Sequence, residues 1–216
     1  MEITRFHLIR HALVEPAARA VLYGDMDVSL CAATLREEAM LHRWLAYRLP
    51  APARWVVTPL SRTRATAEAI FAAGHPAQEL AVEPALAEQS LGEWQGITHE
   101  ALVERLRAPA HPFWPHAADE RPPGGESLAD VRARVAPVMD RLCEAHAGQD
   151  VVIVAHGGSI RAVLSHALNL SAQQALTFSI KNLSLTRIER HGPDWRIVGV
   201  NEEPWVLADD TQSGPG

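Results

Sequence analysis

Short apolar runs alternate with helix-like segments along this chain, and that alternation constrains the fold more than any other feature of the sequence. The clearest run is Val151–Ala155, and Ile3–Ile9 is a second run that is mostly apolar. Short runs of this kind are typical of strands that are buried on both faces of a parallel sheet. Arg54–Thr58 and, with a weaker signal, Leu80–Val82 are expected to be further strands.

Helical periodicity fills the intervals between these runs. The strongest example begins at Ser127 and carries a long apolar stripe, with Pro137 expected to kink or break the helix. Another helix is expected over Ser61–Ala73, and one more is expected to be capped by Thr34 and to stop before Pro50. Helices therefore connect successive strands, as they do in α/β folds.

The last part of the chain again has the pattern of strands, and a turn at 191–194 joins the final two. The expected strands are Leu176–Lys181, Leu183–Glu189 and Trp195–Val200. Alternation of strands and helices, followed by a closing hairpin, predicts an α/β fold in three layers. We expect a sandwich in which helices cover both faces of a mixed, mainly parallel sheet.

Length and composition limit the domain count and the class of partner. A chain of 216 residues suits one large domain, expected over 1–207 with an inserted lid at about 86–126 and a frayed tail at 208–216. A formal net charge of −6 argues against a nucleic-acid partner. No apolar run approaches the length of a membrane span, so no membrane partner is expected. Cys31 and Cys143 stand far apart, which fits reduced thiols in a cytoplasmic protein.

Several polar residues follow directly on the predicted strands, where α/β proteins bind their ligands. Arg10 and His11 end the first strand, Arg62 follows the second, and His156 and Gly157 follow the last parallel strand. Each has a plainer interpretation when taken alone. His11 could be a loop histidine bonded to backbone, Arg62 an exposed helix residue, and His156 a satisfied core histidine.

Taken together, these segments resemble the histidine phosphatase superfamily, in the branch that includes the cofactor-dependent phosphoglycerate mutases. Each segment alone is a weak signal, but they occur in the family's order. The segments are Leu8–Ala12, Tyr23–Leu30, Thr58–Ala67, Glu88–Gly96, Pro123–Ser127 and Val154–Gly158. The resemblance implies a phosphoglycerate mutase-like fold and a phosphatase that needs neither a metal nor another cofactor.

The resemblance also implies a role for each strand-end residue. His11 would attack phosphorus and form a phosphohistidine, for which it must be neutral. Arg10 and Arg62 would hold the phosphoryl oxygens with their planar forks. His156 would be protonated or strongly donating, at the start of a helix whose amide groups favour an anion.

Glu88 is implied as the acid that protonates the departing alcohol and then as the base that activates water. Another branch of the superfamily has an aspartate directly after the second histidine, whereas glycines follow it here. By spacing alone, Glu93 and Glu126 are rivals of Glu88. Gly157 and Tyr23 are further candidates for contact with the substrate.

Hydrolysis of a small-molecule phosphate ester is the expected reaction. The mutases have an insertion after the acid with a lysine and paired arginines, and the 89–122 segment is short and shows neither feature. A phosphoglycerate-type mutase and a non-catalytic phospholigand-binding module are the alternatives. The Tyr23–Leu30 segment is similar to those of α-ribazole phosphatases and of broad-specificity phosphatases, so the sequence does not identify the substrate. It does not decide the oligomeric state either, for which a homodimer is one option.

Overall fold

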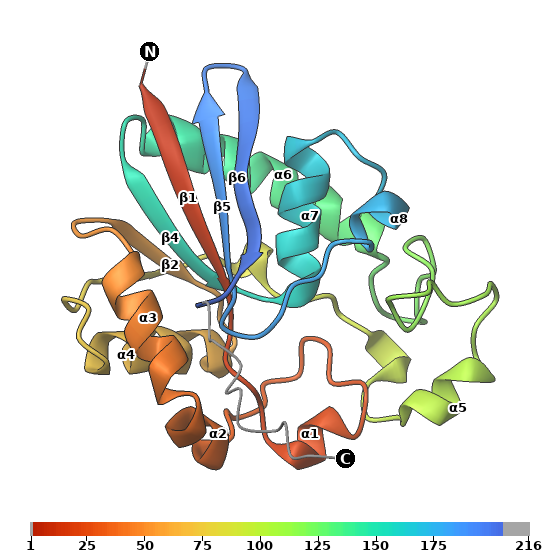
Figure 1. The fold of residues 1–216 in the computed structure, drawn as a ribbon. Helices are drawn as coiled ribbons and strands as arrows, with labels where there is room; N and C mark the ends of the chain where they lie inside the picture. The colour runs from red at the N-terminus through yellow and green to blue at the C-terminus, as the bar shows by residue number, and fades with distance from the viewer. Residues whose placement is uncertain (1, 205–216) are drawn as a thin grey trace, which may run out of the picture.

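The computed structural model describes residues 2–204, so the expected tail at 208–216 lies outside the described residues. At its centre is a six-stranded sheet with the strand order β3-β2-β4-β1-β5-β6 (Figure 1). The strands are β1 (Ile3–Arg10), β2 (Arg54–Val57), β3 (Leu80–Val82), β4 (Asp150–Ala155), β5 (Leu185–His191) and β6 (Asp194–Glu202).

Four neighbouring strands of the sheet are parallel. β3, β2, β4 and β1 pair in this way, whereas β5 runs antiparallel to β1 and β6 antiparallel to β5. The register aligns Arg10 with Ala155 and Val57 with Val154, so that β1, β2 and β4 end at the same edge of the sheet. The sheet is therefore mixed and mainly parallel, as the sequence predicts.

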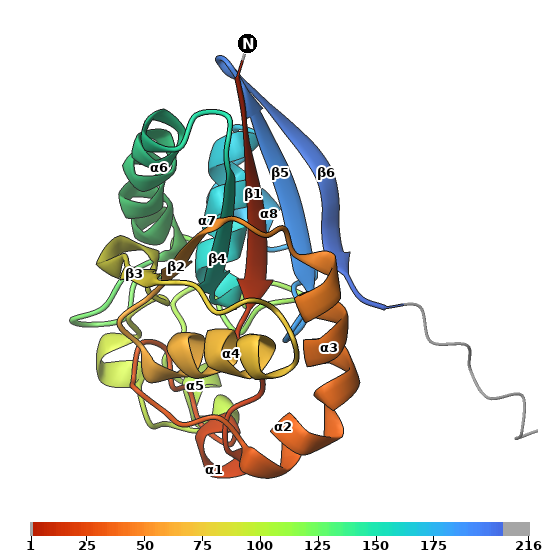
Figure 2. The ribbon, with the colours of Figure 1, turned by 90° about the vertical axis from the view of Figure 1, so that its left-hand side faces the viewer.

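Helices cover both faces of the sheet (Figure 2). α3 and α4 pack on one face, and α6 and α7 pack on the other. The helices are α1 (Pro16–Arg19), α2 (Ala32–Glu37), α3 (Ala39–Arg48), α4 (Ser61–Ala72), α5 (His99–Val103), α6 (Leu128–Ala145), α7 (Gly157–Ala167) and α8 (Ala172–Ala175), with short 3-10 turns η1 (Pro84–Leu86) and η2 (Gly92–Trp94). The predicted three-layer α/β fold is confirmed. Within residues 2–204, no helix is long and apolar enough to cross a membrane.

Two apolar cores flank the sheet, because successive side chains of a strand point to opposite faces. In β4, Val151 and Ile153 belong to the core beneath α6 and α7. Val152 and Val154 belong to the core beneath α3 and α4. Burial on both faces explains why this strand is an uninterrupted apolar run in the sequence.

A third, smaller apolar cluster joins the loop after β1 to the segment around α5. Its buried members are Leu22, Leu91, Trp94 and Leu102. Leu22 also donates its N–H to the carbonyl of Ile97 at 2.9 Å and accepts from the N–H of Gly96 at 2.8 Å. The 86–126 segment is thereby packed against the 12–31 loop, below the carboxyl edge of the sheet in Figure 1.

One predicted strand is wrong for a reason that concerns the site. Leu176–Lys181 is irregular, because two of its carbonyl groups accept from arginine side chains and not from a neighbouring strand. The carbonyl of Phe178 accepts from Nε of Arg161 at 3.0 Å, and that of Ile180 accepts from Nη1 of Arg10 at 2.7 Å.

Two helix predictions also need correction. Thr34 does not cap its helix, because α2 already begins at Ala32 and a second helix, α3, continues the segment to Arg48. α6 continues through Pro137 as one helix, so a local break does not occur there, whereas a kink at this proline stays a prediction. The buried residue Val138 follows this proline directly and packs in the apolar core, which holds this part of the helix against the sheet.

A capping box at the start of α6 is expected to stabilise the fold. Ser127 accepts a hydrogen bond from the N–H of Asp130 at 3.2 Å, and Asp130 accepts from the N–H of Ser127 at 2.8 Å. Ser127→Ala should lower the free energy of unfolding by about 1 kcal/mol in a urea titration. Ser171→Ala removes the exposed cap of the short α8 and should have a smaller effect. Equal losses in the two variants would contradict this account.

Candidate active site

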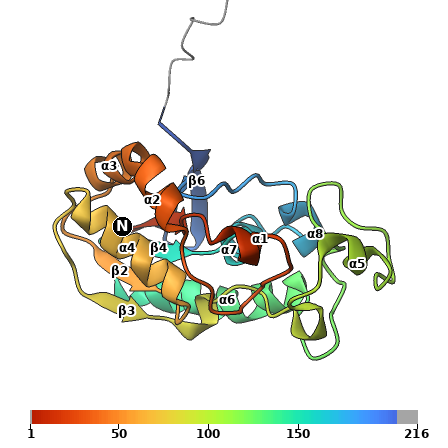
Figure 3. The ribbon, with the colours of Figure 1, turned by 90° about the horizontal axis from the view of Figure 1, so that it is seen from below.

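Three strands bring most of the predicted site residues to one edge of the sheet, which Figure 3 views from below. Because Arg10 pairs with Ala155, the next residue on each strand, His11 and His156, lie side by side with ring centroids 5.2 Å apart. Arg62 reaches the same edge from the first turn of α4, after β2. Residues from three separate parts of the sequence therefore share one site.

His11 is held as a neutral imidazole with a defined proton. Its side chain is 1% exposed, and its Nδ1 lies 2.7 Å from the carbonyl oxygen of Ala12. Since a carbonyl can only accept, Nδ1 carries the proton and Nε2 keeps its lone pair. Burial, together with the charges of Arg62 and Arg10, lowers the pKa of His11 well below its ordinary value. Asn182 fixes the backbone here by donating Nδ2 to the carbonyl of His11 at 2.7 Å.

The surroundings of His156 favour the neutral imidazole, so of the two expected states, protonated or strongly donating, the structure favours the second. The side chain is fully buried, and burial followed by the nearby His11 and Arg62 lowers its pKa well below the ordinary value. Its Nε2 lies 2.9 Å from Oγ1 of Thr58. Nδ1 is buried and has no hydrogen-bond partner within residues 2–204. A neutral imidazole can still donate one hydrogen bond, so the donating part of the expectation stands as a prediction.

Main-chain carbonyl groups hold the two predicted arginines. Arg62 is fully buried and donates to the carbonyl oxygens of Met26 at 2.6 Å and Gly24 at 2.8 Å. Arg10 donates to the carbonyl oxygen of Ile180 at 2.7 Å. Carbonyl groups orient a guanidinium without carrying a full negative charge, so the positive charges stay available to an anion.

Glu88 comes to the site from the segment after β3. Its Oε2 accepts from the N–H of Gly158 at 3.1 Å, and its Oε1 accepts from the N–H of Gln89 at 2.9 Å. A Cβ atom on residue 158 would overlap the Glu88 carboxylate, so this approach requires glycine. The rivals lie elsewhere, since Glu93 is exposed and Glu126 pairs with an arginine of α6.

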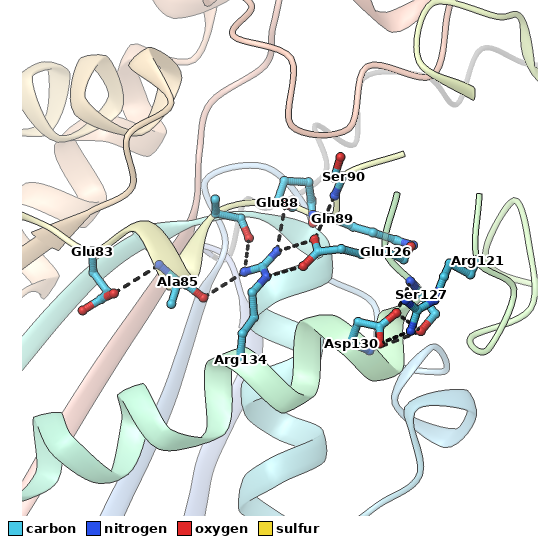
Figure 4. A network of polar contacts seen from close by, with 11 residues as sticks. Glu83, Ala85, Glu88, Gln89, Ser90, Arg121, Glu126, Ser127, Asp130 and Arg134 are labelled. Carbon is cyan, nitrogen blue, oxygen red and sulfur yellow. Dashed lines mark hydrogen bonds and ion pairs between the residues drawn. The ribbon is translucent and has the colours of Figure 1, made fainter. Parts of the chain in front are cut away.

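Arg134, on α6, fixes the backbone around Glu88 (Figure 4). Its guanidinium donates to the carbonyl oxygens of Ala85 at 2.8 Å, Ala87 at 3.0 Å and Glu88 at 3.0 Å. The same group pairs with the carboxylate of Glu126 through two bonds of 2.8 and 2.9 Å. A planar fork that makes five contacts holds the segment rigidly.

A cleft opens beside these residues, between the 12–31 loop and the 86–126 segment. Its lining includes Arg10, Tyr23, Glu88, Trp114 and His116. The ring centroid of Tyr23 lies 5.4 Å from Cζ of Arg62. Gly157 lies against the guanidinium of Arg10, because a Cβ atom there would be 3.6 Å from its Cζ. The two predicted substrate-contact residues are thus next to the two predicted arginines.

Arg161 is a third arginine near the site, buried like Arg62, and no sequence motif indicates it. Its Nη1 donates to the carbonyl oxygen of Gly157 at 3.0 Å, and its Cζ lies 4.5 Å from the ring centroid of Trp114. Burial, with a smaller effect of the Arg10 charge, lowers the pKa of Arg161 to about 10, so it stays charged near neutral pH. It adds to the positive charge around the site.

A family model described as the histidine phosphatase superfamily (branch 1) matches residues 6–203. The chain belongs to this superfamily. The family and the enzyme class predicted from the sequence motifs are confirmed, and so is the phosphoglycerate mutase-like α/β fold.

Some relatives of this histidine phosphatase carry a phosphatase name, and others are named 2,3-bisphosphoglycerate-dependent phosphoglycerate mutases. Glucosyl-3-phosphoglycerate phosphatase of Mycolicibacterium vanbaalenii is 30% identical over 177 residues, which cover 79% of this chain and 76% of the relative. The protein of the same name from Mycobacterium tuberculosis is 27% identical over 217 residues, 95% of each chain. A solved structure of mycobacterial glucosyl-3-phosphoglycerate phosphatase superposes with a TM-score of 0.75 at 27% identity, covering 91% of this chain and 98% of that one.

Several residues that shape the site of this histidine phosphatase are not evident in the sequence. Arg134 gives a weak signal, because it is a cation beside the apolar positions Val131 and Val135 of an amphipathic helix. Thr58 ends a strand but resembles any polar strand end. Asn182 gives no local signal, since only the fold brings it to His11.

Buried neutral histidines should make the stability of this histidine phosphatase fall in acid. Burial lowers the pKa of five histidines: His7, His11, His42, His116 and His156. Each binds a proton more readily in the unfolded chain than in the folded one. The free energy of unfolding therefore decreases as the pH falls below about 6.5, by up to about 1.4 kcal/mol per pH unit for each histidine.

Urea unfolding at several pH values between about 7 and about 5.5 measures this loss. His11→Gln removes one such group and should give a shallower pH dependence than the wild type. Stability that is flat or rises over this range would contradict burial in the neutral form.

Proposed function

We propose that this histidine phosphatase hydrolyses its ester through a phosphohistidine on Nε2 of His11. The observation that carries the proposal is the proton arrangement of that imidazole. Nδ1–H is bound to the carbonyl oxygen of Ala12, so a lone pair on Nε2 is available at a site that also holds Arg10 and Arg62. A neutral nitrogen nucleophile among fixed cations suits attack on a phosphate monoester.

Two displacements complete the reaction. In the first, Nε2 of His11 bonds to phosphorus while the bond from phosphorus to the ester oxygen breaks, and the departing oxygen takes a proton from Glu88. In the second, Glu88 takes a proton from water as its oxygen bonds to phosphorus and the phosphorus–nitrogen bond breaks. Phosphate leaves, and both side chains return to their starting states.

Fixed cations support a mechanism that needs no metal. A phosphate monoester carries a charge close to −2 near neutral pH. Arg10 and Arg62 offer guanidinium groups whose only described acceptors are main-chain carbonyl oxygens, and α7 begins at Gly157 with its amide groups toward the same edge. These groups supply the neutralisation of phosphoryl oxygens that a metal ion supplies in other phosphatases.

Glu88 is proposed as the proton donor and acceptor because it shares the site's edge with the phosphoryl-binding groups. The N–H of Gly158 lies 3.1 Å from Oε2 of Glu88, one residue from the proposed anion-binding start of α7. Arg134 supports its position through three carbonyl contacts. Tyr23 lines the cleft beside Glu88 and is proposed, with Gly157, to contact the ester.

The names of the relatives make glucosyl-3-phosphoglycerate the first natural ester to test. A mutase would return the phosphoryl group to a second hydroxyl, whereas a phosphatase releases inorganic phosphate. The unpaired cysteines Cys31 and Cys143 support a cytoplasmic location.

His11→Ala should lower kcat/KM for p-nitrophenyl phosphate by at least about 10³-fold, because the nucleophile is lost. The wild type should keep its activity in excess EDTA and should form an acid-labile phosphohistidine on rapid quenching. Substantial turnover by His11→Ala, or loss of wild-type activity in EDTA, would overturn the proposed mechanism.

Glu88→Gln should slow alkyl esters by about 10²- to 10⁴-fold, because a poor leaving group needs a proton. Aryl esters such as p-nitrophenyl phosphate leave more easily and should lose less in the first step. Glu93→Gln is the matched control, since Glu93 is exposed, and it should keep wild-type rates. Equal losses for alkyl and aryl esters, measured under single-turnover conditions, would argue against Glu88 as the acid.

A further inference from the structure

Whether a neutral His156 can donate a hydrogen bond to a phosphoryl oxygen depends on which of its two nitrogens carries the proton. Phosphoryl oxygens only accept hydrogen bonds, so the nitrogen that faces them must be protonated. Nε2 is occupied by Oγ1 of Thr58 at 2.9 Å, which leaves Nδ1 for the phosphoryl group. Nδ1 is also the nitrogen that lacks a partner among the residues described.

The hydrogen of the Thr58 hydroxyl has one preferred direction. Oγ1 of Thr58 already accepts from the N–H of Leu60 at 3.3 Å. The neighbouring hydroxyl of Thr63 donates to the carbonyl of Leu60 at 2.9 Å and accepts from the N–H of Thr58 at 3.1 Å. Of the two acceptors left for the Thr58 hydrogen, Nε2 of His156 is closer, at 2.9 Å against 3.2 Å for Oγ1 of Thr63. It is also the stronger base.

We propose that Thr58 is a positioning residue that donates its hydroxyl hydrogen to Nε2 of His156 and so fixes the imidazole proton on Nδ1, the nitrogen that serves the phosphoryl group. The inference rests on the proposed function, and it adds that His156, whose ring centroid lies 5.2 Å from that of His11, donates to a phosphoryl oxygen. No charge is created by this arrangement, which suits a ring that is fully buried near two arginines.

The two imidazoles of the site then differ in function because their hydrogen-bond partners differ. A carbonyl oxygen, which can only accept, keeps the proton of His11 on Nδ1 and leaves a lone pair on Nε2. A hydroxyl that donates does the reverse for His156, because it occupies the lone pair of Nε2 and leaves N–H at Nδ1. One ring is thereby prepared as a nucleophile and the other as a hydrogen-bond donor.

Burial makes the hydroxyl difficult to replace by solvent. The side chain of Thr58 is 2% exposed, and Thr63 and His156 are fully buried. Thr58→Val keeps the shape of the side chain but leaves Nε2 of His156 without a donor. The imidazole proton is then free to move to Nε2, which turns a lone pair on Nδ1 toward the phosphoryl oxygens.

The test compares Thr58→Val with Thr58→Ser, and uses Thr63→Val as a control with the same chemical change at an adjacent buried site. Thr58→Val should lower kcat/KM for p-nitrophenyl phosphate by about 10- to 100-fold, as expected for one unsatisfied buried group. Thr58→Ser should restore most of the activity. Thr63→Val is expected to lose stability without moving the proton of His156.

Long-range ¹H–¹⁵N spectra of ¹⁵N-histidine-labelled protein, with saturating inorganic phosphate, report the proton position directly. The wild type, Thr58→Ser and Thr63→Val should show the proton of His156 on Nδ1, and Thr58→Val should show it wholly or partly on Nε2. A proton on Nε2 in the wild type, or an unchanged spectrum and rate in Thr58→Val, would overturn the inference. Failure to trap a phosphohistidine would instead overturn the proposed function, and the spectra would still report the tautomer.

Discussion

The constraint on which this structure depends is that a phosphoryl site needs buried positive charge that is not already neutralised. Pairing Arg10, Arg62 and Arg161 with carboxylates would stabilise them but would compete with a phosphate ester. Main-chain carbonyl oxygens accept some of their hydrogen bonds instead, and within residues 2–204 Nε of Arg10 and Nε of Arg62 have no partner. Four of these five carbonyl groups belong to irregular backbone in the 12–31 loop and the 176–184 segment, and the fifth, that of Gly157, lies in the first turn of α7.

The second requirement is that each histidine of the site carries its proton on the correct ring nitrogen, and hydrogen bonds to neighbouring groups determine this. Burial lowers the pKa of both His11 and His156, but burial alone does not decide which nitrogen of a neutral ring holds the proton. The carbonyl of Ala12 determines the position of the proton on His11.

Glu88 needs a different kind of support, because it must stay near the reacting oxygen while its charge changes. Arg134 provides that support by binding backbone oxygens, so its contacts persist in either protonation state of the Glu88 side chain.

The sequence predicts most of the fold and the centre of the site for one physical reason. Strands buried on both faces are apolar runs, and Arg10, His11 and His156 lie at or just after the ends of such runs. Other features depend on contacts that no local pattern encodes. The carbonyl acceptors that turn Leu176–Lys181 into a loop belong to the tertiary structure, and so does the burial that lowers the pKa of His156. Spacing also leaves Glu88 equivalent to its rivals until Gly158 is seen beside it.

The contacts around Arg10 and His11 also have a consequence for how the protein reaches its native state. Arg10 bonds to Ile180 and His11 to Asn182, residues that lie 170 and 171 positions further along the chain. During synthesis the first strand therefore emerges long before the groups that hold its polar end, and β5, its antiparallel neighbour, is also late. Contacts of such high sequence separation close slowly. The cationic pocket should thus be among the last parts to assemble, and truncated or nascent chains that contain the family's first motif should lack a working phosphoryl site.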